Sequence, residues 1–204
     1  MKSGNFLPDY TLRDILRRYP LIQKNINKVT IMGGNINTKG NVLPQNPKHN
    51  FILPNAEYNF WLDPDSISDV LEILRGKVEI VPLDCTNFAP LNKKIINEIK
   101  CENILFSKKD KFLTKLYNTF IKLLETTLET ENGNLYLWDL VATLIFLNYD
   151  IKQRVKFIPL KISMTRKLTP YFGNKQIFYE SINFQIMKKT ILHSIFKPNF
   201  ISDT

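Results

Sequence analysis

Two short runs rich in β-branched residues constrain the fold of this chain more than any other feature. The first, Lys28–Gly34 (KVTIMGG), closes on two glycines, and the second is Lys77–Cys85 (KVEIVPLDC). Such runs are typical of strands buried in a sheet. Between them lies a helical pattern whose apolar positions are Ile67, Val70, Leu71 and Leu74. Strands that alternate with helices predict an α/β protein with a mainly parallel sheet flanked by helices.

The other periodic patterns extend this scheme. Apolar residues at helical spacing predict further helices, and capping or breaking residues mark their ends. The expected helices are one that ends after Tyr19 at Pro20, one from Asp63-Pro64 to Gly76, one capped by Ser107 and Asp110 and broken at 132–134, one over 138–148 and one over 186–196. Strands are expected in the basic tail, within VKFIPLKISM and QIFYESINF.

Length, cysteine content and hydropathy limit the class of protein. The 204 residues suit a single domain over residues 1–204. Cys85 and Cys101 form neither a CxxC pair nor a disulfide framework, which fits a reducing compartment and predicts a cytoplasmic location. The first residues have no apolar core of a signal peptide, and no apolar stretch reaches about 18 residues without charge. We therefore expect no membrane partner.

The formal net charge of +9 and the pI near 9.4 raise the hypothesis of a nucleic-acid binder. The lysines, however, are scattered through Asn/Lys/Ile-rich sequence, and no basic stripe interleaved with aromatic residues is present. This distribution favours a solvated surface, and we expect no nucleic-acid partner. A basic nucleic-acid binder remains a third hypothesis that rests on charge alone.

The segment Asn55–Pro64 (NAEYNFWLDP) contains a pair of residues suited to a sugar ligand. Glu57 and Asn59 are two positions apart, so in an extended segment their side chains point the same way. A carboxylate accepts hydrogen bonds from hydroxyls, and an amide both donates and accepts. The same spacing is also typical of a turn whose polar groups satisfy one another, and spacing alone leaves both interpretations open.

Four motifs in a fixed order resemble a known family. VTIMGG, then Gly40-Asn41, then NAEYNFWLDP and then VEIVPLDCTNFAP follow within about sixty residues. This order resembles the inosine/uridine-preferring nucleoside hydrolases, which cleave the N-glycosidic bond of purine and pyrimidine ribonucleosides to base and ribose. The resemblance is best over residues 8–150 and weak in the tail. It implies a partial nucleoside hydrolase-type fold, the C-terminal portion of such a domain.

The resemblance implies roles for individual residues. Met32 would pack beside the ribose, and the side chains of Asn41, Glu57 and Asn59 would hydrogen-bond its hydroxyls. The expected partner is therefore a ribonucleoside or ribose. The family's usual assemblies also suggest a homo-oligomer.

Asp139 stands in the otherwise almost wholly apolar stretch LYLWDLVATLIF. Burying an unpaired carboxylate is costly, so this position needs an explanation. One explanation needs no ligand, because an aspartate in the first turn of a helix is favoured by the helix dipole. The resemblance offers another: Asp139 matches a family aspartate that ligates calcium, which implies Ca²⁺ as cofactor.

The sequence also departs from the family. Trp138 stands where the family has a histidine that protonates the leaving group, and an indole cannot act as a general acid. The interpretations of Trp138 are that it fills the space or stacks on a purine base. The family motif DTDPGxDD, which supplies calcium ligands and the catalytic base, is absent. Tyr10 matches the position of a loop threonine whose carbonyl binds the metal.

No residue of this chain is predicted to replace the missing catalytic groups. Asp63 and Asp84 belong to a helix start and a strand end, and neither His49 nor His193 sits in a recognisable dyad. We therefore predict no catalytic residue in this chain. We expect nucleoside hydrolysis to be impaired or absent in this chain alone, with a missing N-terminal half as a possible partner. The alternative is a non-catalytic remnant that binds ribose or nucleoside, or a partner protein.

Overall fold

The computed structural model describes residues 8–42, 56–106, 111–130, 135–162 and 168–196. The chain forms two compact units. Unit 1 comprises residues 1–86 and 152–182, and unit 2 comprises residues 87–151 and 183–204. The single domain over residues 1–204 stays a prediction.

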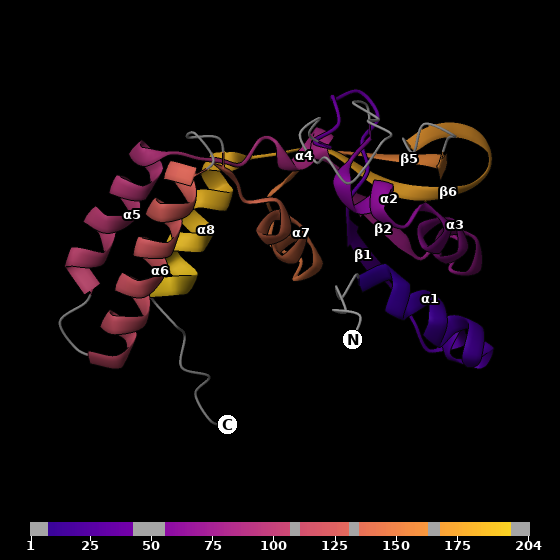
Figure 1. Cartoon of the computed structure of the whole chain (residues 1–204), viewed down its shortest axis with the longest axis horizontal. Helices are drawn as coiled ribbons and strands as arrows, with labels where there is room; N and C mark the ends of the chain where they lie inside the picture. The colour runs from indigo at the N-terminus through magenta and orange to yellow at the C-terminus, as the bar shows by residue number, and fades with distance from the viewer. Residues whose placement is uncertain (1–7, 43–55, 107–110, 131–134, 163–167, 197–204) are drawn as a thin grey trace. The chain divides into compact units, whose positions relative to one another are not determined.

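Unit 1 contains a four-stranded sheet in the order β1-β2-β6-β5 (Figure 1). β1 (Val29–Met32) and β2 (Val78–Val81) are parallel, and β6 (Leu168–Ile182) continues the parallel arrangement beside β2. β5 (Lys152–Ile162) pairs with β6 in the antiparallel sense. The predicted α/β fold with a mainly parallel sheet flanked by helices is confirmed, and both β-branched runs form adjacent strands.

One face of this sheet is covered by α1 (Pro8–Arg18) and α3 (Pro64–Ile73), which lie side by side in Figure 1. α1 ends before Pro20, as predicted, and the 3-10 helix η1 (Pro20–Lys24), which was not predicted, follows it. The Asp63 carboxylate caps α3 by accepting from the Ser66 amide (3.0 Å). Removing these apolar side chains from water contributes most of the stability of the unit. Its core comprises Leu16, Ile31, Phe60, Ile67, Val70, Leu71, Leu74, Val78, Ile80 and Phe178.

The strand predicted over Lys77–Cys85 is shorter than expected. β2 ends at Val81, and α4 (Leu83–Thr86) begins two residues later. Pro82 has no amide hydrogen for the strand ladder, whereas its carbonyl accepts from the amides of Cys85 and Thr86 (both 2.9 Å). The prediction was wrong at this end, and the difference places Asp84 in a helical turn.

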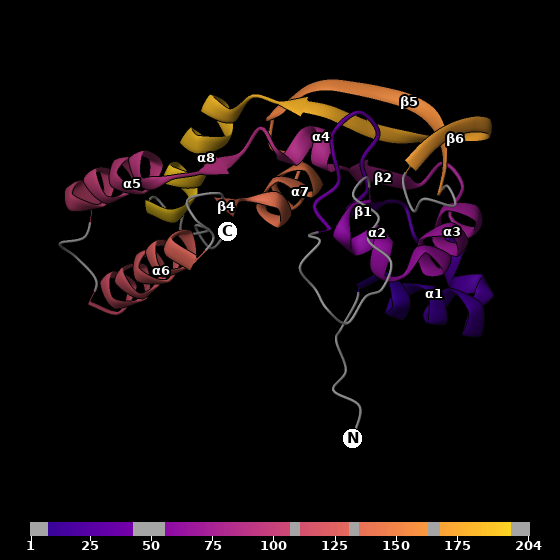
Figure 2. The ribbon, with the colours of Figure 1, turned by 45° about the horizontal axis from the view of Figure 1, so that its top comes forward.

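Unit 2 is built mainly of helices: α5 (Lys93–Phe106), α6 (Lys111–Thr130), α7 (Trp138–Phe146) and α8 (Phe184–Phe196). α5 packs against both α6 and α8, and the three helices are grouped in Figure 2. A two-stranded antiparallel ladder joins β3 (Pro90–Leu91) to β4 (Leu135–Tyr136). The core of the unit comprises Leu91, Ile95, Ile96, Ile99, Ile121, Leu124 and Leu128.

The helices of unit 2 agree with the sequence predictions except for α5, which was not predicted. Its signals are a cap, in which Asn92 Oδ1 accepts from the Ile95 amide (3.0 Å), and isoleucines at helical spacing. α7 ends at Phe146, before the predicted Asn148, which has a left-handed backbone conformation (φ 60°). The predicted caps Ser107 and Asp110 and the break at 132–134 lie outside the described residues.

Within the part of the chain that the structure describes, no helix is both long enough and apolar enough to cross a lipid bilayer.

Candidate functional site

The segment after residue 55 forms a helix start, which agrees with the interpretation of a turn whose polar groups satisfy one another and not with an extended segment. Glu57 is the N-cap of α2 (Tyr58–Leu62), and its side chain is 1% exposed. Its Oε1 accepts from the Asn59 amide (2.9 Å), and its Oε2 accepts from the amides of Phe60 (3.0 Å) and Gly34 (2.8 Å). One buried carboxylate therefore caps α2 and also ties it to the chain that leaves β1.

Asn59 joins α2 to the end of β1. Its side-chain Nδ2 donates to the backbone oxygen of Met32 (3.3 Å) and lies 3.4 Å from the Met32 sulfur. Met32 is the last residue of β1, at the carboxyl end of a parallel strand. In open α/β sheets this end of the strands is where ligands bind.

Asn41 contacts the first residue of α2 and the residue just before Glu57. Its Oδ1 accepts from the Tyr58 amide (2.8 Å), and its own amide donates to the Ala56 oxygen (3.1 Å). The structure thus brings Met32, Asn41, Glu57 and Asn59 together around the start of α2, all within unit 1. The predicted contacts of these residues with ribose stay predictions.

A glycine pair makes the turn from β1 to this site possible. Gly33 (φ 156°) and Gly34 (φ 74°) both have positive φ values. A Cβ atom on Gly33 would lie 2.5 Å from the Phe60 ring and 3.2 Å from Glu57 Oε2. The backbone therefore approaches α2 closely enough for the Gly34 amide to donate to Glu57.

Asp84 holds the part of the chain that follows the glycine pair after β1. Its carboxylate is 7% exposed and accepts from the amides of Ile36 (2.8 Å) and Asn37 (2.7 Å). The sequence interpretation gave Asp84 no role. The signal available was only its position after a buried strand, because its partners lie almost fifty positions earlier in the chain.

The thiol beside Asp84 is not a nucleophile at neutral pH. Burial, with a smaller contribution from the neighbouring Asp84 carboxylate, raises the pKa of Cys85 to about 12. Only the thiolate form of a cysteine is a good nucleophile, and this environment suppresses it. Cys85 is therefore a packing residue of α4.

Asp139 is exposed in the first turn of α7, in unit 2. The premise that it is a buried charge was wrong, and a solvated carboxylate needs no ligand to offset desolvation. Among the described residues, no three histidine, cysteine or acidic side chains are close enough to hold a metal ion. One carboxylate is far fewer than the roughly six to eight oxygens that calcium takes, so these residues do not assemble a calcium centre. Ligation of Ca²⁺ by Asp139 stays a prediction.

The remaining positions that the sequence analysis weighed for metal binding or catalysis are less informative. Tyr10 lies within α1, so its carbonyl belongs to a helix rather than to a loop. His193 lies in α8, but its side chain is outside the described part of the structure, as is the whole of His49.

Trp138 is held by neighbours in its own unit. Its indole Nε1 donates to Asn87 Oδ1 (3.1 Å). Its ring stacks on Tyr136, with the ring centroids 5.8 Å apart and the planes at 4°. These contacts account for a tryptophan at the start of α7 without a ligand, although they do not test stacking on a base.

We expect Trp138→Phe to destabilise unit 2 by about 1 kcal/mol, because phenylalanine keeps the ring stack but loses the donor to Asn87. Urea denaturation followed by circular dichroism measures this loss. The same substitution in an Asn87→Ala background should cost clearly less, since the acceptor is already gone. An equal cost in both backgrounds would show that the Asn87 hydrogen bond contributes nothing.

Two of the sequence relatives have the names of nucleoside-cleaving enzymes. The chain is 27% identical over 117 residues to a uridine nucleosidase of Saccharomyces cerevisiae, covering 56% of this chain and 30% of that protein. It is 32% identical over 108 residues to the non-specific ribonucleoside hydrolase RihC of Salmonella paratyphi A, covering 52% and 30%. The chain therefore spans about a third of the length of these curated relatives.

Solved structures share the fold. An inosine-uridine preferring nucleoside hydrolase from Bacillus anthracis superposes with a TM-score of 0.67 at 22% identity, covering 92% of this chain and 58% of that one. A purine-preferring ribonucleoside hydrolase from Gardnerella vaginalis gives a TM-score of 0.63 with the same coverage. The family model of the inosine-uridine preferring nucleoside hydrolases matches residues 11–176. The match covers most of the chain, and the chain belongs to the inosine-uridine preferring nucleoside hydrolase family.

Proposed function

We propose that this chain binds the ribose of a ribonucleoside at the start of α2, as part of a nucleoside-hydrolysing function. The supporting observation is that the four family-matched residues of unit 1 converge there from β1, from the loop at Asn41 and from α2. Family membership supports the substrate class.

The chemistry of the two asparagines suits a sugar. Asn41 uses its Oδ1 on the Tyr58 amide, and Asn59 uses its Nδ2 on Met32. The opposite groups, Nδ2 of Asn41 and Oδ1 of Asn59, are then the donor and the acceptor that would meet ribose hydroxyls. The thioether of Met32 would contact the apolar face of the sugar ring.

Glu57 has a different role in this proposal from the one that the family match implies. Its carboxylate accepts from three backbone amides, so its first task is to position Asn59 and the glycine turn. A ribose hydroxyl that reached Glu57 would meet a carboxylate already held in place, which lowers the entropic cost of binding.

Hydrolysis of an N-glycosidic bond needs more than ribose binding. The family is metal-dependent. The reaction passes through an oxocarbenium-like state and needs an oriented, activated water molecule. The groups that gather at α2 are amides and one fully engaged carboxylate, so we infer that their contribution is to bind and orient ribose. Cleavage by this chain alone is expected to be impaired or absent, and a non-catalytic nucleoside-binding protein is the alternative.

The edge strand β1 offers a place where a second chain could add a strand to the sheet. Among the described residues β1 pairs only with β2, which leaves β1 at the edge. An edge strand offers backbone donors and acceptors to a further strand. We propose that an N-terminal portion of the family fold, supplied as a separate chain, would add to this edge and restore hydrolysis.

The two thiols support a reducing location. Both cysteines are free, with Cys85 buried and Cys101 exposed. An exposed free thiol persists best where glutathione keeps thiols reduced, so we infer a cytoplasmic protein.

The ribose site is tested by calorimetric titration of the full chain with ribose, uridine and inosine. We expect Asn59→Ala to weaken binding about tenfold, the equivalent of one hydrogen-bonded group at ~1.4 kcal/mol. Asn37→Ala, an exposed asparagine of the same unit, is the matched control and should leave binding unchanged. Equal affinities for wild-type and Asn59→Ala chains would contradict the site.

An assay for release of reducing sugar from uridine and inosine, with added Ca²⁺ and with a chelator, distinguishes a hydrolase from a non-catalytic nucleoside-binding protein. Binding without release supports the non-catalytic version, and release that depends on Ca²⁺ supports the hydrolase. Adding a separately produced N-terminal portion of a family member tests whether a second chain restores release. Absence of binding to all three compounds would overturn the proposed function.

A further inference from the structure

A short loop leads from the glycine pair after β1 to Asn41 in the proposed ribose site. We call residues 35–40 the 35–40 loop. Asn41 follows it directly, and its Oδ1 accepts from the Tyr58 amide at the start of α2 (2.8 Å). The loop lies beside α4 in both Figure 1 and Figure 2. The path of the loop therefore determines where the Asn41 side chain stands relative to the rest of the site.

Asp84 binds this loop with both oxygens of its carboxylate. Oδ2 accepts from the Ile36 amide (2.8 Å), and Oδ1 accepts from the Asn37 amide (2.7 Å). Two bonds from consecutive amides fix the orientation of the backbone as well as its position, and bonds to a charged acceptor are stronger than neutral ones. Asp84 is 7% exposed and lies in α4, so the acceptor is itself held in place. The Asn37 amide takes part and not its side chain, so Asn37→Ala keeps both bonds.

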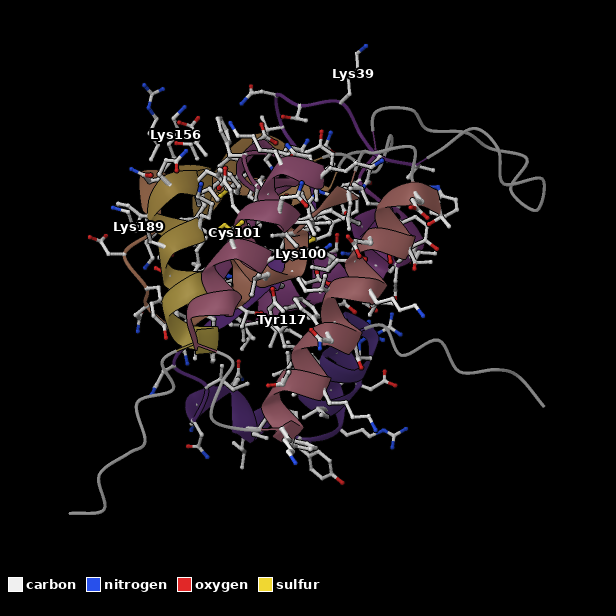
Figure 3. All side chains as sticks on the ribbon, turned by 90° about the vertical axis from the view of Figure 1, so that its left-hand side faces the viewer. Lys39, Lys100, Cys101, Tyr117, Lys156 and Lys189 are labelled. Carbon is white, nitrogen blue, oxygen red and sulfur yellow. The ribbon has the colours of Figure 1, made fainter. Side chains whose placement is uncertain are left out.

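The tip of the loop faces solvent. Asn37 and Lys39 are exposed, and the Lys39 side chain extends away from the ribbon in Figure 3. Asn35 is buried, and its Nδ2 donates to the Thr38 oxygen (2.7 Å), a bond within the loop. The two bonds to Asp84, by contrast, tie the loop to another element of unit 1.

The far end of the loop passes very close to another backbone segment. A Cβ atom on Gly40 would lie 1.9 Å from the Ala56 oxygen, and the Asn41 amide donates to the same oxygen (3.1 Å). The chain can make so close an approach only from a narrow range of directions. Asn37, which Asp84 holds, is four positions before Asn41, and so short a stretch transmits the anchored position to Asn41.

We propose that Asp84 is a positioning residue of the ribose site: it holds the 35–40 loop so that Asn41 Nδ2 faces the sugar. This inference rests on the proposed function, because Asn41 has this task only if ribose binds at the start of α2. Asp84 touches no substrate and acts through Asn41. Asn59 is held by the end of β1 and by the cap of α2, so its contribution should not depend on Asp84.

Asp84→Ala should release the loop without unfolding unit 1. Ile36 is half-buried and Asn37 is exposed, so water can replace the lost acceptor at both amides. We expect hydrogen exchange at these two amides of the ligand-free chain to become at least about tenfold faster, with little change at the Phe60 amide of the α2 cap. Asp65→Ala removes an exposed carboxylate of the same unit and should change neither rate. Unchanged exchange in Asp84→Ala would overturn the proposal.

Calorimetric titration with uridine tests whether Asp84 acts through Asn41. We expect Asn41→Ala to weaken binding about tenfold and Asp84→Ala about fivefold. In the Asn41→Ala background, Asp84→Ala should cause little further loss, because the group that it positions is already gone. In the Asn59→Ala background, the full loss from Asp84→Ala should remain. A general weakening of unit 1 would instead give the same loss in both backgrounds.

Asp84→Asn keeps the size of the side chain and one acceptor oxygen, so its affinity should fall between those of wild type and Asp84→Ala. Circular dichroism shows whether each variant is folded, and Asp84→Asn replaces Asp84→Ala in the comparison if the alanine variant is not. Unchanged uridine affinity, or equal losses in the Asn41→Ala and Asn59→Ala backgrounds, would overturn this inference alone. Absence of ribose, uridine and inosine binding by the wild-type chain would overturn the proposed function and this inference together.

Discussion

Replacing Glu57 with alanine is expected to lower the free energy of unfolding of unit 1 by about 4 kcal/mol. The substitution leaves the amides of Gly34, Asn59 and Phe60 without their acceptor. Because Glu57 is 1% exposed, water cannot replace the carboxylate without opening the structure. Each orphaned donor costs about 1–3 kcal/mol, and the three are lost together.

Urea denaturation followed by circular dichroism measures this effect, and hydrogen exchange at the Gly34 and Phe60 amides localises it. Glu57→Gln keeps an acceptor oxygen and should fall between wild type and Glu57→Ala. Glu72→Ala removes an exposed carboxylate of α3 that pairs with Arg75, and it should change stability by less than about 0.5 kcal/mol. A loss below about 1 kcal/mol for Glu57→Ala would show that the capping network is not a support of the fold.

Gly40→Ala should destabilise unit 1 by about 3 kcal/mol, although it adds only one methyl group. The new Cβ would lie 1.9 Å from the Ala56 oxygen and 2.5 Å from its carbon and nitrogen. These are backbone atoms and cannot rotate away, so the two segments must separate. The hydrogen bond from the Asn41 amide to the Ala56 oxygen would be strained, and the Asn41 side chain would move from Tyr58.

Gly76→Ala is the matched control for this substitution. Gly76 has φ 73°, and a Cβ at this position would meet nothing within 4 Å. Its cost is then only the left-handed backbone conformation, about 1–2 kcal/mol. Denaturation of both variants separates conformational strain from collision with Ala56. Equal losses would contradict the steric argument, and weaker uridine binding in Gly40→Ala alone would link the collision to the proposed ribose site.

Local sequence signals predicted most of the fold because most of its elements are locally determined. The β-branched runs became β1 and β2, and Asp63 before Pro64 became the cap of α3. The errors lie where short-range rules compete. Pro82 ended β2 early, and α7 ended at Phe146, before Asn148 with its left-handed backbone.

The sequence predicted which residues form the candidate site but not the hydrogen bonds that join them. The ordered motifs identified Met32, Asn41, Glu57 and Asn59, whereas the bond from Gly34 to Glu57 joins residues 23 positions apart. Asp139 shows the opposite error. The apolar stretch suggested burial, but Asp139 and Thr143 are four residues apart on an exposed helix face, while Val141 and Ile145 are buried.

The sheet order of unit 1 has a consequence for synthesis on the ribosome. β6 lies between β2 and β5, yet its last residue, Ile182, follows all of residues 87–151, which belong to unit 2. Translation therefore delivers β1, β2 and the residues of the proposed ribose site long before the strand that pairs with β2 on its other side. Until β6 emerges, one edge of β2 has no partner strand, and this is the period when a chaperone would protect the nascent chain from aggregation.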